Sequence, residues 1–182
     1  MAERDKKFEQ SVLPHLDSAF NLARWLTGND QDAQDVVQDA CLRAHRSIDS
    51  LRGADGRPWL LAIVRNSSFT WLRANRPAEV TASLDDPSRD DRNFADETSP
   101  SPEMLALGNL DRQVLNEAVA ALPAQFREAL ILRELEEMSY NDIARVTGAP
   151  IGTVMSRLAR ARRLLAHSFQ VILSHADVGG RK

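Results

Sequence analysis

A proline-rich, acidic stretch from Arg76 to about Pro102 limits what this chain can fold into. It contains four prolines and many Asp and Ser residues, but few large apolar side chains. Such a segment cannot bury enough apolar surface to offset the entropy lost on ordering. We therefore predict two small domains joined by an acidic linker. The expected boundaries are 8–77 for the first domain, 78–106 for the linker, 107–172 for the second domain and 173–182 for a flexible tail.

Both sides of the linker favour helices. Ala, Leu and Arg are plentiful among the 182 residues, and aromatic residues make up 5%. Apolar residues recur every three or four positions, and no alternating strand pattern is visible. We expect an all-α fold. The predicted helices lie near 12–27, 31–45 and 58–75 in the first domain, and near 111–121, 124–137, 140–147 and 150–169 in the second. Asp30 or Asp32 is expected to cap the helix near 31–45.

The charge distribution favours a nucleic-acid partner although the net charge is −3. Residues 78–110 hold eight acidic and two basic groups, so both flanking domains are slightly basic. Residues 57–77 and 151–166 each contain four Arg and no acid. Local fields of this kind matter more for DNA binding than the total charge does.

Several classes of protein are disfavoured. Cys41 is the sole cysteine, so we expect neither a disulfide nor a cysteine-based metal site. His45 lies four residues further on, but two ligands make a poor metal site. The N-terminus lacks the apolar core of a signal peptide, and no apolar run is long enough for a membrane span. We predict a cytoplasmic protein without catalytic residues, metal, cofactor, small-molecule substrate or membrane insertion.

A helix-turn-helix is predicted near residues 139–166. Ser139 and Asp142 resemble a capping box, and Gly148 ends the short helix that follows. On the next helix, one face carries Val154, Leu158, Ala161 and Leu165. The outer face carries Thr153, Ser156, Ala159, Arg160 and Arg163, with Arg157 and Arg162 beside it. Guanidinium and hydroxyl groups can bind base edges and phosphates. A solvated, Arg-rich surface is the alternative, and the preceding turn favours DNA.

The run from Met138 to Arg163 closely resembles region 4 of extracytoplasmic-function sigma factors, in particular its Gly-Thr-Val-x-Ser-Arg-Leu-x-Arg-Ala-Arg string. The resemblance implies that this helix enters the major groove at the −35 promoter element. The residues implied to bind there are Thr153, Met155, Ser156, Arg157, Ala159, Arg160 and Arg163.

The run from Asp32 to Arg46 is similar to region 2.2 of the same family. The resemblance implies that its polar face binds core RNA polymerase at the β′ coiled coil, with the β flap as a further contact of the factor. The implied residues are Asp35, Gln38, Asp39 and Leu42. Taken alone, this segment could also be a solvated acidic helix start that the helix dipole stabilises.

The run from Arg57 to Arg76 resembles regions 2.3 and 2.4, which read the −10 element and hold a flipped-out base. Aromatic, amide, hydroxyl and Arg side chains alternate there, as a single strand requires. The residues implied are Trp59, Arg65, Asn66, Thr70 and Arg73, although Trp59 could belong to the core instead. The loop from Ser50 to Gly56 is where the family builds the base pocket.

We therefore predict an extracytoplasmic-function sigma factor that binds core polymerase and promoter DNA and serves a stress or envelope-response regulon. The resemblance also implies an anti-sigma factor. An autonomous helix-turn-helix regulator is the alternative, although its expected α/β receiver domain is not visible. A nucleic-acid enzyme is disfavoured because the four His residues are scattered along the chain.

Overall fold

The computed structural model describes residues 2–53, 55–81 and 112–179, and all regular structure in these ranges is helical. The first half contains α1 (Ala2–Ser11), α2 (Leu16–Thr27), α3 (Asp30–Ser47), α4 (Arg57–Asn75) and α5 (Pro77–Thr81), with short 3₁₀ helices at Leu13–His15 and Ile48–Ser50. The second half contains α7 (Arg112–Ala120), α8 (Ala124–Glu134), α9 (Tyr140–Thr147) and α10 (Ile151–Gly179). The predicted all-α fold is confirmed.

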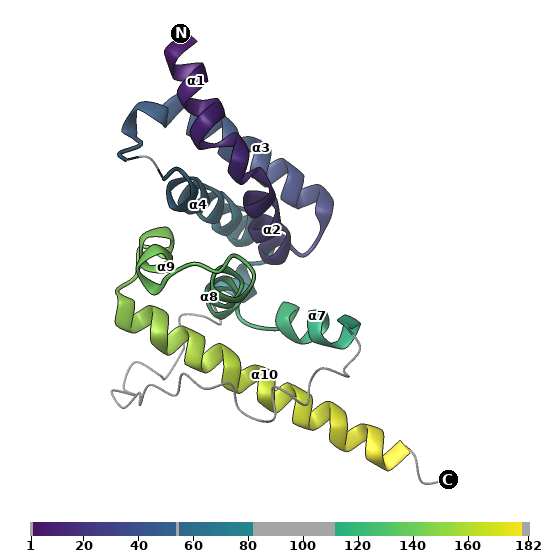
Figure 1. Cartoon of the computed structure of the whole chain (residues 1–182). Helices are drawn as coiled ribbons and strands as arrows, with labels where there is room; N and C mark the ends of the chain where they lie inside the picture. The colour runs from purple at the N-terminus through teal and green to yellow at the C-terminus, as the bar shows by residue number, and fades with distance from the viewer. Residues whose placement is uncertain (1, 54, 82–111, 180–182) are drawn as a thin grey trace.

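Helices α2, α3 and α4 pack around the core of the first half (Figure 1). Leu22 and Leu26 of α2 and Leu60, Leu61 and Leu72 of α4 are fully buried. Burial of each such side chain stabilises the fold by roughly 2 kcal/mol. The apolar faces predicted from three- and four-residue spacing therefore do form this core.

Helix α3 meets its neighbours through small residues. Ala33, Ala40 and Ala44 are fully buried. Because these side chains are short, α3 can lie close to α2 and α4 while its opposite face stays free. Leu42 on that opposite face is 54% exposed.

The turn between α2 and α3 shows one difference from the sequence prediction. Gly28 ends α2 in the left-handed region, at φ 87°. The N-cap of α3 is Asn29, whose side-chain oxygen accepts a hydrogen bond of 2.9 Å from the Asp32 backbone N–H. The prediction that Asp30 or Asp32 caps this helix was wrong. Asn29 has the extended backbone that a cap requires, at φ −152° and ψ 162°.

The second half contains the predicted helix-turn-helix, formed by α9 and α10. Ser139 Oγ accepts a 3.1 Å hydrogen bond from the Asp142 backbone N–H and donates one of 2.6 Å to the Asp142 carboxylate. Gly148 ends α9 with φ 67°. The predicted inward stripe is buried, and its members are Val154, Leu158, Ala161 and Leu165.

Three helical segments extend beyond the predicted ones. Helix α1 begins at Ala2, and α10 continues to Gly179 rather than ending near Phe169. Residues 78–81, expected to open the linker, form the end of α5. The rest of the predicted linker, residues 82–106, lies outside the described residues.

The two halves pack against each other (Figure 1). Helix α4 lies along α9, and α2 lies along α8, with α5 adding a smaller contact to α8. We call this surface the interdomain interface, and the arrangement that it produces the closed form. Helix α3 and most of α10 lie on opposite outer sides of it.

Candidate polymerase and nucleic-acid interfaces

The polar face of α3 is open for a partner. Asp35, Gln38 and Leu42 are exposed, and Asp39 is half-buried beside them. The positions i, i+3, i+4 and i+7 place all four on one helix face. The structure thus brings the four predicted polymerase-binding residues together.

Asp39 connects this face to α4. Its carboxylate pairs with Arg43 Nε at 2.8 Å and accepts a hydrogen bond of 3.3 Å from Ser67 Oγ. Ser67 directly follows Asn66, a predicted −10 contact. The predicted polymerase-binding and DNA-binding surfaces of the first half therefore adjoin.

Asn66, Thr70 and Arg73 form an exposed row on α4. They lie at i, i+4 and i+7, so their side chains follow one face of the helix. Thr70 Oγ1 donates to the Asn66 carbonyl oxygen at 2.9 Å, which orients the hydroxyl along the helix. The three exposed side chains of this row carry an amide, a hydroxyl and a guanidinium group, and none of them is acidic.

Arg65 departs from this row. Its Nε and Nη2 donate hydrogen bonds of 2.7 and 3.2 Å to the two carboxylate oxygens of Glu128 on α8. Its guanidinium also lies 4.3 Å from the centre of the Phe69 ring. The predicted −10 contact Arg65 is therefore held in the interdomain interface.

Trp59 lies in a shallow pocket of about 580 Å³ that the loop before α4 helps to form. The loop contributes Ser50, Leu51, Arg52, Gly53 and Asp55, and α4 contributes Pro58, Trp59 and Ala62. Arg145 of α9 completes the lining. The loop expected to build a base pocket thus does border a hollow, and in the closed form a residue from the other half covers part of it.

The predicted −35 residues lie along the first four turns of α10. Arg163 is exposed, and Thr153, Met155, Ser156, Ala159 and Arg160 are partly exposed. Arg157, predicted to flank this face, turns inward instead. Its Nη1 lies 3.6 Å from Glu128 Oε1, and its side chain is 20% exposed.

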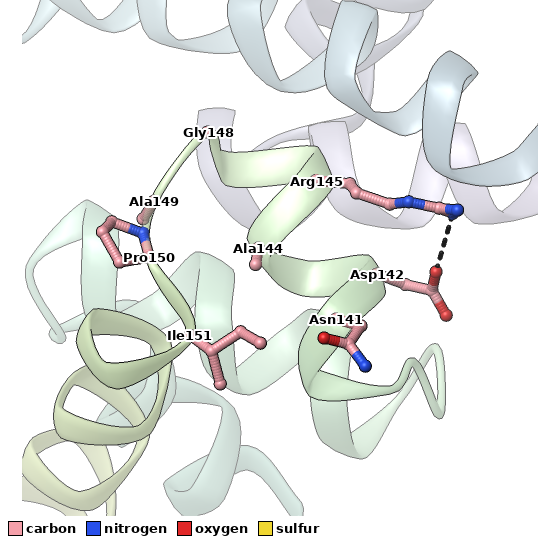
Figure 2. A pocket seen from close by; sticks show the side chains of 8 residues that line it. All are labelled: Asn141, Asp142, Ala144, Arg145, Gly148, Ala149, Pro150 and Ile151. Atoms are coloured by element: carbon pink, nitrogen blue, oxygen red, sulfur yellow. Dashed lines mark hydrogen bonds and ion pairs between the residues drawn. The ribbon is translucent and has the colours of Figure 1, made fainter.

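A second hollow, of about 760 Å³, lies at the turn of the helix-turn-helix. Figure 2 shows Ala144, Pro150 and Ile151 around it, with the Arg145–Asp142 ion pair, 3.1 Å long, at its edge. The hollow is wide open, and its lining residues belong to the turn that positions α10. We assign it no ligand.

Burial shifts the ionisation of the two paired groups at the centre of the interface. Complete burial raises the pKa of Glu128, and the neighbouring Arg65 and Arg157 oppose that rise. Burial also lowers the pKa of Arg157, against the attraction of Glu128. A charged Glu128 therefore depends on the two arginines that face it.

Glu136 forms a second interdomain cluster. Its carboxylate pairs with Arg57 Nη2 at 2.6 Å and accepts a hydrogen bond of 2.6 Å from Asn21 Nδ2. Burial tends to raise the pKa of Glu136, but hydrogen bonds from Ser18, Asn21 and Arg57 lower it below its ordinary value. A third pair joins Glu79 of α5 to the buried Arg127 of α8, at 2.7 Å.

Sequence reasoning missed these interdomain residues. A signal was present in α8, where Arg127 and Glu128 stand within the apolar run from Phe126 to Leu132. All seven of these residues are buried, although charged residues are rarely buried without partners. Their partners in the first half, Glu79 and Arg65, could not be identified because they lie 48 and 63 residues away along the chain.

The described residues contain no group of three or more potential metal ligands, and none of their helices is long and apolar enough to cross a membrane. Cys41 is half-buried, and burial raises the pKa of its thiol.

Each half of the chain matches a known protein family. The family profile Sigma-70 region 2 matches residues 12–77, and the profile Sigma-70, region 4 matches residues 112–165. The two ranges fall within the two helical halves on either side of the interface.

Individual relatives agree with the profiles. The chain is 33% identical to the RNA polymerase sigma-H factor of Pseudomonas aeruginosa over 176 residues, which cover 94% of this chain and 91% of the relative. It is 36% identical to the ECF RNA polymerase sigma-E factor of Haemophilus influenzae over 157 residues, covering 84% and 81%. The sigma-E factor of Escherichia coli K12 is 34% identical over 145 residues, covering 78% and 76%.

Two solved structures share the fold. The sigma factor RpoE of Bartonella quintana, crystallised with the anti-sigma factor NepR, matches with a TM-score of 0.66 and 31% identity, covering 91% of this chain and 98% of that one. CnrH, solved with the cytosolic domain of CnrY, matches with a TM-score of 0.59 and 23% identity, covering 88% and 85%. The order of the two matched regions, the all-helical fold and the full-length relatives together show that the chain belongs to the sigma-70 family and is an RNA polymerase sigma factor of the extracytoplasmic-function type.

Proposed function

We propose that three surfaces of this sigma factor each perform one binding step of promoter recognition. The exposed face of α3 binds core RNA polymerase, the row of Asn66, Thr70 and Arg73 on α4 binds the −10 strand, and the outer face of α10 binds the −35 duplex. The observation that carries the proposal is the exposed, acid-free row on α4 beside the polar face of α3. A polymerase bound to α3 would lie directly next to the −10 strand bound by α4.

The chemistry of each DNA surface suits its target. Amide and hydroxyl groups can bond the edges of unpaired bases, and Arg73 can neutralise a phosphate. On α10, Arg160 can donate two hydrogen bonds to guanine in the major groove, while Thr153 near the helix start can bond a phosphate. Trp59 in the loop-lined pocket provides an aromatic surface for a flipped base.

We further propose that the chain acts in the cytoplasm, where core polymerase resides, and performs no catalysis itself. The Bartonella relative was solved with an anti-sigma factor, and we expect an anti-sigma partner for this chain too. A stress or envelope-response regulon is the matching biological role.

In vitro transcription on a randomised promoter library tests the assignment of the two DNA surfaces. With core polymerase, Arg160→Ala should relax preference in the upstream element, at a cost of about 1–3 kcal/mol if the arginine is bidentate to guanine. Asn66→Ala should instead weaken selection in the downstream element and slow strand opening, because it removes an amide from the α4 row.

Matched controls lie on α7, where Asn116 and Arg112 are exposed on a helix that contributes no residue to the three surfaces. Asn116→Ala and Arg112→Ala should leave the selected sequences unchanged. If Asn66→Ala and Arg160→Ala select the same promoters as the wild type, the residue assignment is wrong. If the wild type starts no transcripts with core polymerase, the proposal of three recognition surfaces is wrong as a whole.

A further inference from the structure

Helix α1 lies against the segment that leads into the Trp59 pocket. It packs on α3 and on the 3₁₀ helix Ile48–Ser50 (Figure 1). We call residues 50–53, 55 and 56, which lead from this 3₁₀ helix to α4, the pocket loop. The Sigma-70 region 2 profile starts at residue 12, so α1 precedes the part of the chain that the profile matches. The contacts of α1 therefore indicate what it contributes.

One face of α1 follows the chain from the 3₁₀ helix into the pocket loop. Arg4, Lys7 and Ser11 are three and four positions apart, so they lie on the same side of the helix. Arg4 Nε pairs with the carboxylate of Asp49 at 3.1 Å, just before the pocket loop. Lys7 Nζ donates a hydrogen bond of 3.2 Å to the carbonyl oxygen of Leu51, within the loop.

Leu51 is the point at which the chain leaves the 3₁₀ helix. Its backbone is extended, at φ −64° and ψ 114°, and its side chain is buried. Carbonyl groups at the end of a helix lack donors within that helix and attract cations. Because the side chain is held in the core and the carbonyl is held by Lys7, the direction of the chain at the entrance of the pocket loop is fixed.

Ser11, the last residue of α1, defines the other end of the pocket loop. Gly56, the N-cap of α4, is buried against it. A Cβ atom at position 56 would overlap the carbonyl oxygen of Ser11, so this close approach requires a glycine. Helix α1 therefore contacts both ends of the pocket loop, at Leu51 through Lys7 and at Gly56 through Ser11.

The polar groups that line the pocket belong to the segment that these contacts hold. Ser50, Arg52 and Asp55 contribute a hydroxyl, a guanidinium and a carboxylate to the lining that includes Trp59. Asp55 Oδ1 accepts a hydrogen bond of 3.1 Å from the Arg57 backbone N–H. A site is selective only if such groups are held within about 0.5 Å of the productive geometry. The position of the pocket loop thus determines which base edge these groups can bond.

We infer that Lys7 is a positioning residue for base recognition, which acts through the Leu51 carbonyl to hold the pocket loop where it selects a flipped base of the −10 strand. The inference rests on the proposed function, since it takes the Trp59 pocket as the site of that base. Lys7 itself contacts no DNA in this proposal. Its loss should make the pocket less selective and leave the domain folded, because Ile48 and Leu51 still anchor the segment in the core.

The variant Lys7→Met tests this role, because it keeps an unbranched side chain and removes the donor. In vitro transcription with core polymerase on the randomised promoter library measures base preference at each position. Preference at one position of the downstream element should fall by at least about fivefold, the lower end of what one recognised base contributes. Preference in the upstream element, affinity for core polymerase and the urea midpoint of unfolding should match those of the wild type.

Lys6→Met is the matched control, because it removes the same charge from the exposed neighbouring residue. It should select the same promoters as the wild type. Lys7→Arg should also retain the wild-type preference, since arginine again offers N–H donors to the Leu51 carbonyl. The inference is overturned if Lys7→Met leaves the downstream preference unchanged, if Lys6→Met lowers it equally, or if Lys7→Arg loses as much as Lys7→Met.

Trp59→Ala separates this inference from the proposed function. It should lower preference at the same position as Lys7→Met does. If Trp59→Ala alters the selection and Lys7→Met does not, only the role of Lys7 is wrong. If Trp59→Ala leaves downstream selection unchanged, the pocket assignment in the proposed function is wrong, and the role of Lys7 is overturned with it.

Discussion

Glu128 and Glu136 are both buried carboxylates of the second half, yet their surroundings shift their pKa values in opposite directions. Burial dominates at Glu128 and raises its pKa, whereas hydrogen bonds from Ser18, Asn21 and Arg57 lower the pKa of Glu136. A lowered pKa means that the folded state stabilises the carboxylate form. Glu136 therefore contributes stability above its ordinary pKa of 4.5, and this contribution is lost as the pH falls through the lowered value.

The variant Glu136→Gln tests this residue through pH. At pH 7 it should lower the free energy of unfolding by about 2 kcal/mol, because charge-assisted hydrogen bonds from Arg57 and Asn21 are weakened. The difference from the wild type should shrink as the pH drops below 4.5, because the native carboxyl then takes up a proton as well. Urea unfolding between pH 7 and acid conditions measures it.

The neighbouring Glu137→Gln is the control, since Glu137 is exposed. It should show no comparable loss at neutral pH. A difference between Glu136→Gln and the wild type that stays constant down to the most acid pH would show that the carboxylate form is not what stabilises the interface.

At the scale of elements, the sequence predicted most helices because their signals are local. Apolar spacing located α2, α3, α4 and the buried stripe of α10, and the Ser139–Asp142 pair located the start of α9. Helix α1 was missed because its residues from Ala2 to Ser11 are mostly polar. What holds it is tertiary, since Arg4 donates to the carbonyl oxygens of His45 and Arg46 at the end of α3.

The face of α3 yields a prediction at this scale. Leu42→Ala should weaken binding to core polymerase by roughly tenfold, because an apolar side chain at the centre of an interface is desolvated on binding. The free energy of unfolding should change by no more than about 0.5 kcal/mol, since Leu42 is 54% exposed. Titration of labelled protein with core polymerase measures the affinity.

Leu13→Ala is the matched control in the same half, since Leu13 is 45% exposed and lies in the 3₁₀ helix that packs mainly on α1 and α2. It should bind polymerase as the wild type does. If Leu42→Ala and the wild type bind core polymerase with equal affinity, Leu42 is not part of the polymerase contact.

At the scale of the whole molecule, the sequence predicted two domains but not how they meet. Periodicity shows that a helix has an inner face, whereas it does not show which distant helix covers it. Arg65 and Arg157 were therefore predicted on open DNA-binding surfaces, and the structure places both against Glu128. The remaining predicted contacts on α4 and α10 stay at least partly exposed, although the pocket that Trp59 lines is completed by Arg145 of the second half.

The interface also makes the stability of the two halves interdependent in the free protein. Helix α3 packs on α1, α2 and α4 and makes no substantial contact with the described helices of the second half. Val36→Ala on α3 should lower the stability of the first half by about 2 kcal/mol through lost burial. If the closed form predominates, part of that loss must appear in the second half, because α8 and α9 lose their partner when α2 and α4 unfold.

Hydrogen exchange of amides in α8 and α9 measures this transfer. The Val36→Ala variant should exchange faster there than the wild type, although the substitution lies in the other half. Combined with Arg57→Gln, which opens the interface, Val36→Ala should no longer affect exchange in the second half. The reason is that separated halves share no buried surface through which the loss could act. If Val36→Ala leaves the amide exchange rates of α8 and α9 unchanged although Arg57 is present, the two halves are already independent in the free protein.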